Sequence, residues 1–178
     1  MKAQIYVVTG GSGSGKSDYA EELAVSFDSE DTVYLATMMP YGEEGRSRIE
    51  RHKKRRAHRP FRTVERFLDL KGLSVETPAG SRTVLLECMS NLAANEMFDR
   101  DGSADRAEEE ILIGIERLRS QCDQLVIVTN EIFSDGCLYD ESIRDYLKLL
   151  GRINQYLVRE SVKAVEIVYG IPVGIKGT

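Results

Sequence analysis

The chain has 178 residues, three cysteines and a formal net charge of −5 at pH 7. This length suits a single domain, residues 1–178, whose core needs no disulfide or metal cross-link, and no apolar run approaches the length of a membrane span. The acidic balance argues against general nucleic-acid binding, and cysteines without metal-ligand spacing fit a cytoplasmic protein.

The first predicted elements are a strand, a glycine loop and a helix. Apolar, β-branched residues Ile5–Val8 precede the loop, and apolar residues return at helical spacing from Ala20. The residues between them fit G-x-x-x-x-G-K-[ST], the phosphate-binding loop, in which backbone N–H groups surround phosphate oxygens. We therefore expect Lys16 to act in phosphoryl transfer and Ser17 to ligate Mg²⁺, the alternative being a Gly/Ser turn without a ligand. The expected phosphate contacts are Gly10, Gly11, Ser12, Gly13, Ser14, Gly15, Lys16 and Ser17.

The rest of the chain alternates apolar strands with amphipathic helices. The predicted strands are Thr32–Thr37, Phe61–Glu65, Thr83–Cys88, Leu125–Thr129, Ala164–Gly170 and Ile171–Lys176. Helices are predicted over Ala104–Gln121 and along the apolar stripe from Ile143 to Leu157, while Arg46–Arg59 can be helical only as an element lying over the surface. This order predicts an α/β, P-loop nucleotide-binding fold, with a mostly parallel central sheet flanked by helices and a C-terminal antiparallel strand pair.

Ligands of such sheets bind beyond the carboxyl ends of the strands, where this chain carries two candidate acids. Glu87 follows a buried Val-Leu-Leu run, which is where phosphate-loop enzymes place the acid that orients Mg²⁺ or its water. Glu131 is the competing candidate. Either acid could instead be a helix N-terminal residue favoured by the macrodipole.

A basic segment, residues 46–62, interrupts the acidic chain. Nine Lys or Arg residues stand there against one acid, so the segment carries +8 and the remainder of the chain −13. It contains both histidines, His52 and His58, and neighbouring cations favour the neutral imidazole that can attack phosphorus. The alternative is a solvated basic face with two incidental histidines. These residues alone do not decide the class of protein, which could be a kinase, a nucleotidyltransferase, a nucleotide switch or a motor domain. The chain lacks the guanine-reading Asn-Lys-x-Asp motif.

Nearly the whole chain resembles the bifunctional adenosylcobinamide kinase/adenosylcobinamide-phosphate guanylyltransferases of cobalamin assembly. The motifs that carry this resemblance are Val-Thr-Gly-Gly-x-x-Ser-Gly-Lys-Ser (8–17), Tyr-Leu-Ala-Thr (34–37), Arg-Ile-x-x-His-Lys (48–53), Arg-Thr-Val-Glu (62–65), Leu-Leu-Glu-Cys (85–88), Val-Thr-Asn-Glu (128–131), Gly-Arg-Ile-Asn-Gln (151–155) and Gly-Ile-Pro-Val-x-Ile-Lys (170–176). Together they are far more specific than the phosphate loop alone.

The resemblance implies two reactions: phosphorylation of adenosylcobinamide by ATP or GTP, then transfer of GMP from GTP to adenosylcobinamide phosphate. His52 matches the histidine that becomes guanylylated, and Thr37 and Glu65 match nucleotide contacts. Lys53, Arg55 and Arg56 are placed to stabilise charge on the phosphates. A homo-oligomer, a trimer as in the family, is also implied. Where the family often has Arg in its glycine loop, this chain has Gly13.

Two other functions stay open at this stage. The chain could be a small-molecule kinase that has lost the histidine step. It could instead be a non-catalytic nucleotide switch that uses the basic segment to dock an acidic partner.

Overall fold

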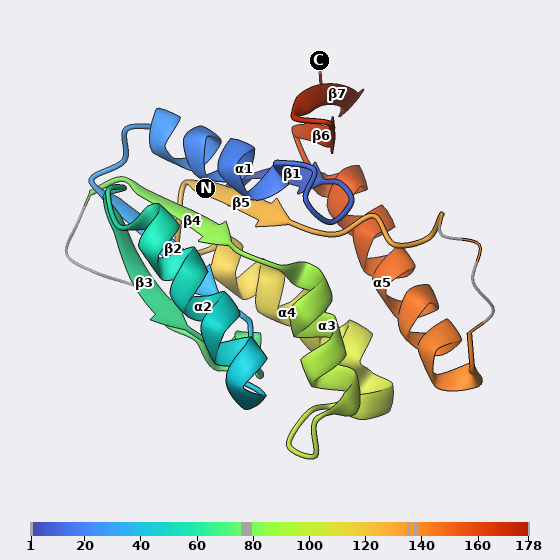
Figure 1. Ribbon diagram of the computed structural model, residues 1–178. Helices are drawn as coiled ribbons and strands as arrows, with labels where there is room; N and C mark the ends of the chain where they lie inside the picture. Colours follow the sequence, from blue (N-terminus) through green and yellow to red (C-terminus); the bar gives the residue numbers. More distant parts are fainter. Residues whose placement is uncertain (1, 76–79, 135, 137–138, 178) are drawn as a thin grey trace.

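One sheet of seven strands runs through the described part of the chain (Figure 1). The computed structural model describes residues 2–75, 80–134, 136 and 139–177, and within one helix the side chains of Glu44, Arg48, His52 and Arg55 lie outside that description. The strand order is β3-β2-β4-β5-β1-β6-β7, and every neighbouring pair is parallel except β6 and β7. The strands are β1 (Gln4–Thr9), β2 (Asp31–Ala36), β3 (Phe61–Glu65), β4 (Arg82–Leu86), β5 (Gln124–Val128), β6 (Lys163–Val168) and β7 (Ile171–Lys176). The predicted fold class is confirmed.

Helices cover both faces of the sheet, which explains why its central strands are continuously apolar. Helix α1 (Lys16–Ser26) packs on one face, where Ala20 and Ala24 meet Tyr34 and Leu85. The other face carries α3 (Met89–Phe98), α4 (Ala107–Arg119) and α5 (Glu141–Glu160), with the short 3₁₀ helices η1 (Leu70–Gly72) and η2 (Ala104–Arg106) beside them. The two faces form separate apolar cores, and the carboxyl ends of the parallel strands open at one edge.

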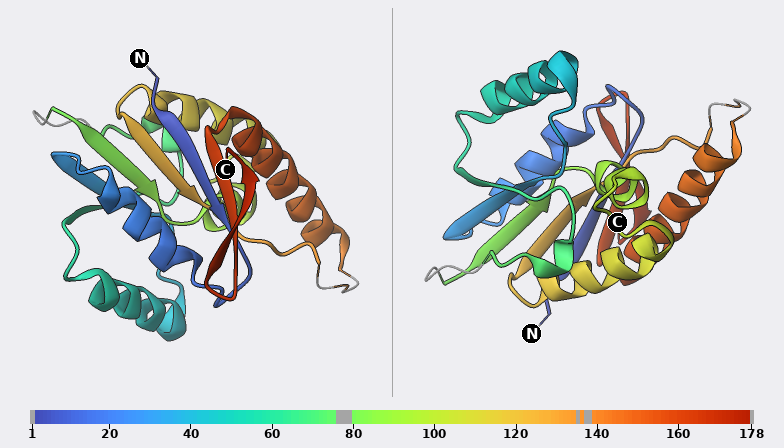
Figure 2. Two further views of the ribbon diagram at one scale, coloured as in Figure 1. Left: turned by 90° about the horizontal axis from the view of Figure 1, so that it is seen from above. Right: turned by 90° about the horizontal axis from the view of Figure 1, so that it is seen from below.

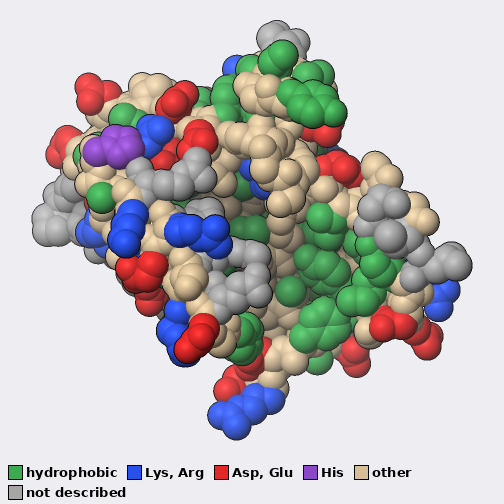
Figure 3. All heavy atoms as spheres, in the orientation of Figure 1, with side chains coloured by type: hydrophobic (Ala, Val, Ile, Leu, Met, Phe, Trp, Pro, Cys, Tyr) green, Lys and Arg blue, Asp and Glu red, His purple; other side chains and the backbone are tan. Residues whose placement is uncertain are grey.

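Helix α2 (Gly42–Arg56) holds most of the basic segment and stands off from the sheet on the side of α1 (Figure 2). Lys and Arg side chains gather over it on the surface (Figure 3). The sequence allows a helix from Arg46, yet α2 begins four residues earlier, at Gly42. It does so because the Gly45 N–H donates to the Tyr41 carbonyl at 3.1 Å, which closes the first turn.

Helix α3 has no counterpart in the sequence prediction. Its residues Asn95 and Glu96 are polar but buried, so they break the apolar periodicity by which a helix is recognised. Both are satisfied by backbone from other elements. The Asn95 amide donates to the carbonyls of Thr37 and Phe67 at 2.9 and 3.0 Å, and Glu96 accepts from the Asp69 N–H at 2.7 Å.

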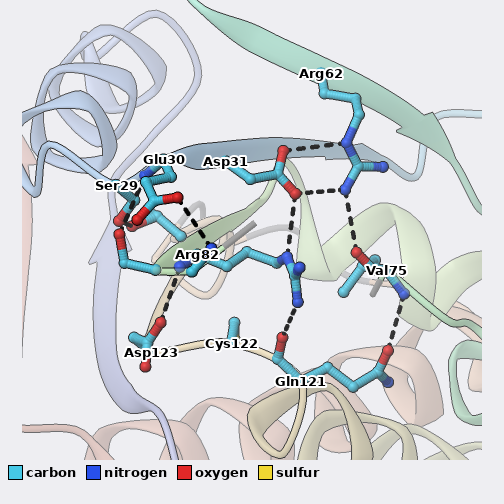
Figure 4. Close-up of polar contacts among 12 residues, drawn as sticks. Ser29, Glu30, Asp31, Arg62, Val75, Arg82, Gln121, Cys122 and Asp123 are labelled. Atoms are coloured by element: carbon cyan, nitrogen blue, oxygen red, sulfur yellow. Dashed lines mark hydrogen bonds and ion pairs between the residues drawn. The ribbon is translucent and has the colours of Figure 1, made fainter. Parts of the chain in front are cut away.

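A polar network joins the amino ends of three neighbouring strands, at the opposite edge from the glycine loop (Figure 4). Asp31 of β2 accepts two hydrogen bonds from Arg62 of β3, at 3.1 and 2.7 Å, and a third from Arg82 of β4, at 3.1 Å. Arg82 also donates to the Gln121 carbonyl at 2.7 Å. Because the Asp31 and Arg82 side chains are only 11% and 8% exposed, this network is structural.

Candidate nucleotide site

The glycine loop between β1 and α1 has a backbone that only glycine adopts easily. Gly13 and Gly15 have φ angles of 73° and 92°, in the left-handed region. A Cβ at Gly10 would stand 2.6 Å from the Ser14 Oγ and 2.7 Å from the Ile167 carbonyl oxygen. The loop is therefore a tight cradle that ends at Lys16, where α1 begins and its free N–H groups favour an anion.

Two neighbouring segments hold the loop in place. The Glu131 N–H, just after β5, donates to the Gly10 carbonyl at 3.1 Å, and the Gly170 N–H, in the β6–β7 turn, donates to the Ser14 carbonyl at 2.9 Å. The loop is thus fixed to strands on both sides of β1 before any ligand binds, which reduces the entropic cost of binding.

The Lys16 ammonium lies inside this loop. Its Nζ donates to the Gly11 carbonyl at 3.0 Å. Burial lowers the pKa of Lys16, because the charged form loses water that one carbonyl does not replace. An anion in the loop would restore that stabilisation.

A cavity of about 530 Å³ opens beside the loop. Four parts of the chain that lie far apart in sequence line it: the loop and start of α1, the segment from Met38 to α2, the end of β4 with the start of α3, and the end of β5. The lining residues are Ser12, Gly13, Ser14, Gly15, Lys16, Ser17, Asp18, Met38, Arg51, Glu87, Cys88, Asn91, Val128 and Asn130.

Glu87 lies immediately after β4 and lines this cavity together with Ser17. Burial raises the pKa of Glu87 above its ordinary value. The Arg56 guanidinium and hydrogen bonds from the Tyr34 hydroxyl and the Thr37 N–H act in the opposite direction, but burial has the larger effect. The competing acid, Glu131, does not line the cavity.

The Glu131 carboxylate instead forms hydrogen bonds within the loop that follows β5. It accepts from the Phe133 N–H and the Ser134 hydroxyl, both at 3.0 Å. The structure thus brings Lys16, Ser17 and Glu87 to one cavity and leaves Glu131 beside it.

The other expected nucleotide contacts lie in a smaller hollow under α2. Lys53 and Glu65 form an ion pair at 3.3 Å, and the buried Arg56 guanidinium lies 3.9 Å from the centre of the Tyr34 ring. These residues share the smaller hollow with Glu87, which also lines the main cavity.

The expected contact Thr37 has its hydroxyl engaged internally. It is fully buried and donates to the Cys88 carbonyl at 2.8 Å. The side chains of His52 and Arg55 lie outside the described residues, although the backbone of both belongs to α2. His58 follows that helix and is exposed.

Seven cavity residues had no assigned role in the sequence analysis: Asp18, Met38, Arg51, Cys88, Asn91, Val128 and Asn130. The sequence could have indicated Asn130 as a site residue, because it follows the buried strand β5 at its carboxyl end. Asn91 had no such signal, because it belongs to the helix that the sequence failed to predict.

The residues of the cavity fit Mg²⁺ bound together with a nucleotide. Among the described residues, no three His, Cys, Asp or Glu side chains are grouped to hold a metal by themselves. Mg²⁺ does not need such a group, since it is commonly held by one or two protein oxygens, phosphates and water. Ser17 and Glu87 line one cavity, and a hydroxyl and a carboxylate are oxygen ligands of that kind.

Among the described residues, no helix combines the length and the apolar character that crossing a membrane requires. Comparison with known proteins gives a more specific result. Residues 6–175 match the family described as cobinamide kinase / cobinamide phosphate guanyltransferase.

Two relatives are both named bifunctional adenosylcobalamin biosynthesis protein CobU. The one from Escherichia coli strain K12 is 34% identical, over 96% of this chain and 98% of its own. The one from Salmonella typhimurium is 33% identical, with the same coverage. Among solved structures, the ATPase domain of G40P aligns with a TM-score of 0.51 at 10% identity, over 93% of this chain and 70% of its own, which shows a shared fold only.

Proposed function

Because the chain belongs to the cobinamide kinase / cobinamide phosphate guanyltransferase family, we propose that it carries out both reactions of that family. It phosphorylates adenosylcobinamide, then transfers GMP from GTP through a guanylylated histidine to adenosylcobinamide phosphate, giving adenosyl-GDP-cobinamide. The observation that carries the proposal is the nearly full-length similarity to two proteins named as bifunctional. The cavity lined by the phosphate loop and Glu87 supports it.

In the kinase reaction, the chain's own residues position and neutralise the triphosphate. Loop N–H groups bind phosphate oxygens, and Lys16 stabilises the charge that develops on the leaving group. Ser17 and Glu87 hold Mg²⁺, which when bound neutralises phosphate charge. ATP and GTP are both candidate donors.

In the guanylyltransferase reaction, His52 is the proposed nucleophile. Transfer through an imidazole replaces one difficult displacement at phosphorus with two easier ones. Lys53, Arg55 and Arg56 supply positive charge in this proposal, and Thr37 and Glu65 contact the nucleotide. The ion pair between Lys53 and Glu65 supports a common role for these two residues.

The test separates the two reactions at the histidines. Wild-type protein incubated with GTP labelled at the α-phosphate should form an acid-labile, base-stable adduct. His52→Ala should lose the adduct and still phosphorylate adenosylcobinamide, because phosphorylating a hydroxyl needs no imidazole nucleophile. His58→Ala, in the same basic segment, is the matched control and should keep both activities.

Other results would refute parts of this proposal. A wild-type protein with kinase activity and no adduct is a kinase only. A protein with neither activity that still binds GTP is a nucleotide switch. A labelled His52→Ala protein, or an unlabelled His58→Ala protein, would overturn the choice of His52.

A homo-oligomer, with the trimer as the family's state, is also part of the proposal. It is supported by the exposed apolar side chains along β6 and β7, where Tyr169, Ile171 and Ile175 are 96%, 65% and 50% exposed. Light scattering that gives a monomer mass would contradict it. A cytoplasmic location is proposed as well, and the free thiols of Cys88 and Cys122 fit a reducing compartment.

A further inference from the structure

The carboxyl end of β5 lies between the two strand ends that carry the proposed phosphate chemistry. In the sheet, β5 pairs with β1, which leads into the glycine loop, and with β4, which leads into Glu87. The register sets Val128 opposite Val8, so Asn130 follows β5 at the level where the loop begins. It lines the same cavity as Lys16 and Glu87.

One end of the Asn130 amide is held by contacts at the start of α3. Its Nδ2 donates to the Ser90 hydroxyl at 2.5 Å and lies 3.7 Å from the Cys88 Sγ, both at the start of α3. Its Oδ1 has no donor among the residues that the structure describes. In this arrangement the available group is an acceptor, on a residue that lines the cavity.

An acceptor at this place does not suit a phosphate group, whose oxygens are themselves acceptors. It suits an O–H group. Under the proposed function, the hydroxyl that must come to this cavity is the one that attacks the γ-phosphorus, and that hydroxyl has a proton to donate.

We propose that Asn130 binds the attacking hydroxyl of the substrate, with Oδ1 accepting its hydrogen bond and aiming its oxygen at the γ-phosphorus. This inference rests on the proposed kinase function. The hydroxyl oxygen forms the new bond to phosphorus while the bond from phosphorus to the β–γ bridging oxygen breaks, and the nucleoside diphosphate leaves. The hydroxyl proton passes to an oxygen of the transferred phosphoryl group, because an amide oxygen is too weak a base to keep it. Asn130 thus acts by orientation.

The test uses a reaction of the same protein that needs no substrate hydroxyl. Asn130→Ala should lower kcat for cobinamide phosphorylation about 100-fold, the cost of losing the alignment of a reacting group. Its Kd for GTP and its labelling by α-phosphate-labelled GTP should both stay within about twofold of wild type, since both depend on the nucleotide alone. These two readouts also show that the variant folds.

Two further variants sharpen the result. Ser90→Ala removes the acceptor that orients the amide, so it should lower kinase kcat by a smaller factor, and the double variant should be no slower than Asn130→Ala. Asn154→Ala is the matched control. Its Oδ1 accepts from the Thr129 hydroxyl at 2.8 Å at the same strand end, so it should disturb packing without the kinase-specific loss.

The results that would overturn the role of Asn130 can be told apart from the result that would overturn the proposed function. If Asn130→Ala loses labelling as much as kinase turnover, the residue serves nucleotide or metal binding and the assignment is wrong. Unchanged kinase kcat in Asn130→Ala, with an active wild type, would overturn the assignment and leave the proposed function standing. A wild-type protein that phosphorylates no cobinamide would overturn both.

Discussion

Lys16→Ala is the substitution that most directly tests the nucleotide site. The ammonium lies within the glycine loop, 3.0 Å from the Gly11 carbonyl, and burial lowers its pKa. A unit charge about 4 Å from a phosphate charge, at an effective dielectric constant of about 20, contributes roughly 4 kcal/mol. Measured losses for one preorganised charge-stabilising group are about 3 kcal/mol. We therefore expect kcat for cobinamide phosphorylation to fall by at least about 100-fold.

The assay is initial-rate kinetics with saturating nucleotide, beside urea unfolding of the same variant. Since burial already disfavours the charged lysine in the folded state, Lys16→Ala should not lower the free energy of unfolding. Lys148→Ala, which removes the same charge from an exposed pair with Asp145 on α5, is the control and should leave kcat unchanged. A Lys16→Ala protein with kcat within threefold of wild type would refute the role of the ammonium.

Three further predictions concern the acids. Glu87→Gln should keep the fold and shift kinase activity to higher Mg²⁺, and Mg²⁺ titration that shows this shift for Glu131→Gln alone would mean the wrong acid was chosen. Asp31→Ala should lower the free energy of unfolding by about 3 kcal/mol in urea, because Arg82 stays buried without its carboxylate; a loss below about 1 kcal/mol would contradict this. Glu116 is partly buried, which raises its pKa, but hydrogen bonds from other side chains bring that pKa to about 2, against 4.5 ordinarily. Between about pH 5 and pH 2 the folded protein therefore binds fewer protons than the unfolded chain. The stability that Glu116 contributes is complete above about pH 5 and should be lost as the pH falls toward 2. Glu116→Gln should flatten that acid limb of the unfolding free energy, and an unchanged limb would exclude the carboxylate as its cause.

Much of the fold was readable because its signals are local. The glycine loop is recognised by residue type and spacing, and a strand covered on both faces is a continuous apolar run, as in β4 and β5. Glu87 could be placed because a parallel strand sends the next side chain to the ligand edge of the sheet. The roles of His52, Lys16 and the other site residues stay predictions, which the proposed variants test.

What the sequence by itself determined is therefore the set of strands, the phosphate loop and the family resemblance, since each depends on neighbouring residues along the chain. Only the tertiary structure decided which distant groups meet. It buries Asn95 and Glu96 of α3 against the backbone of other elements, and it brings the Asn130 amide to the Ser90 hydroxyl of α3. It also places the Arg56 guanidinium on the Tyr34 ring. Polar residues give no periodic signal, and their partners lie on other elements, so their positions emerge only when the sheet and its helices are packed together.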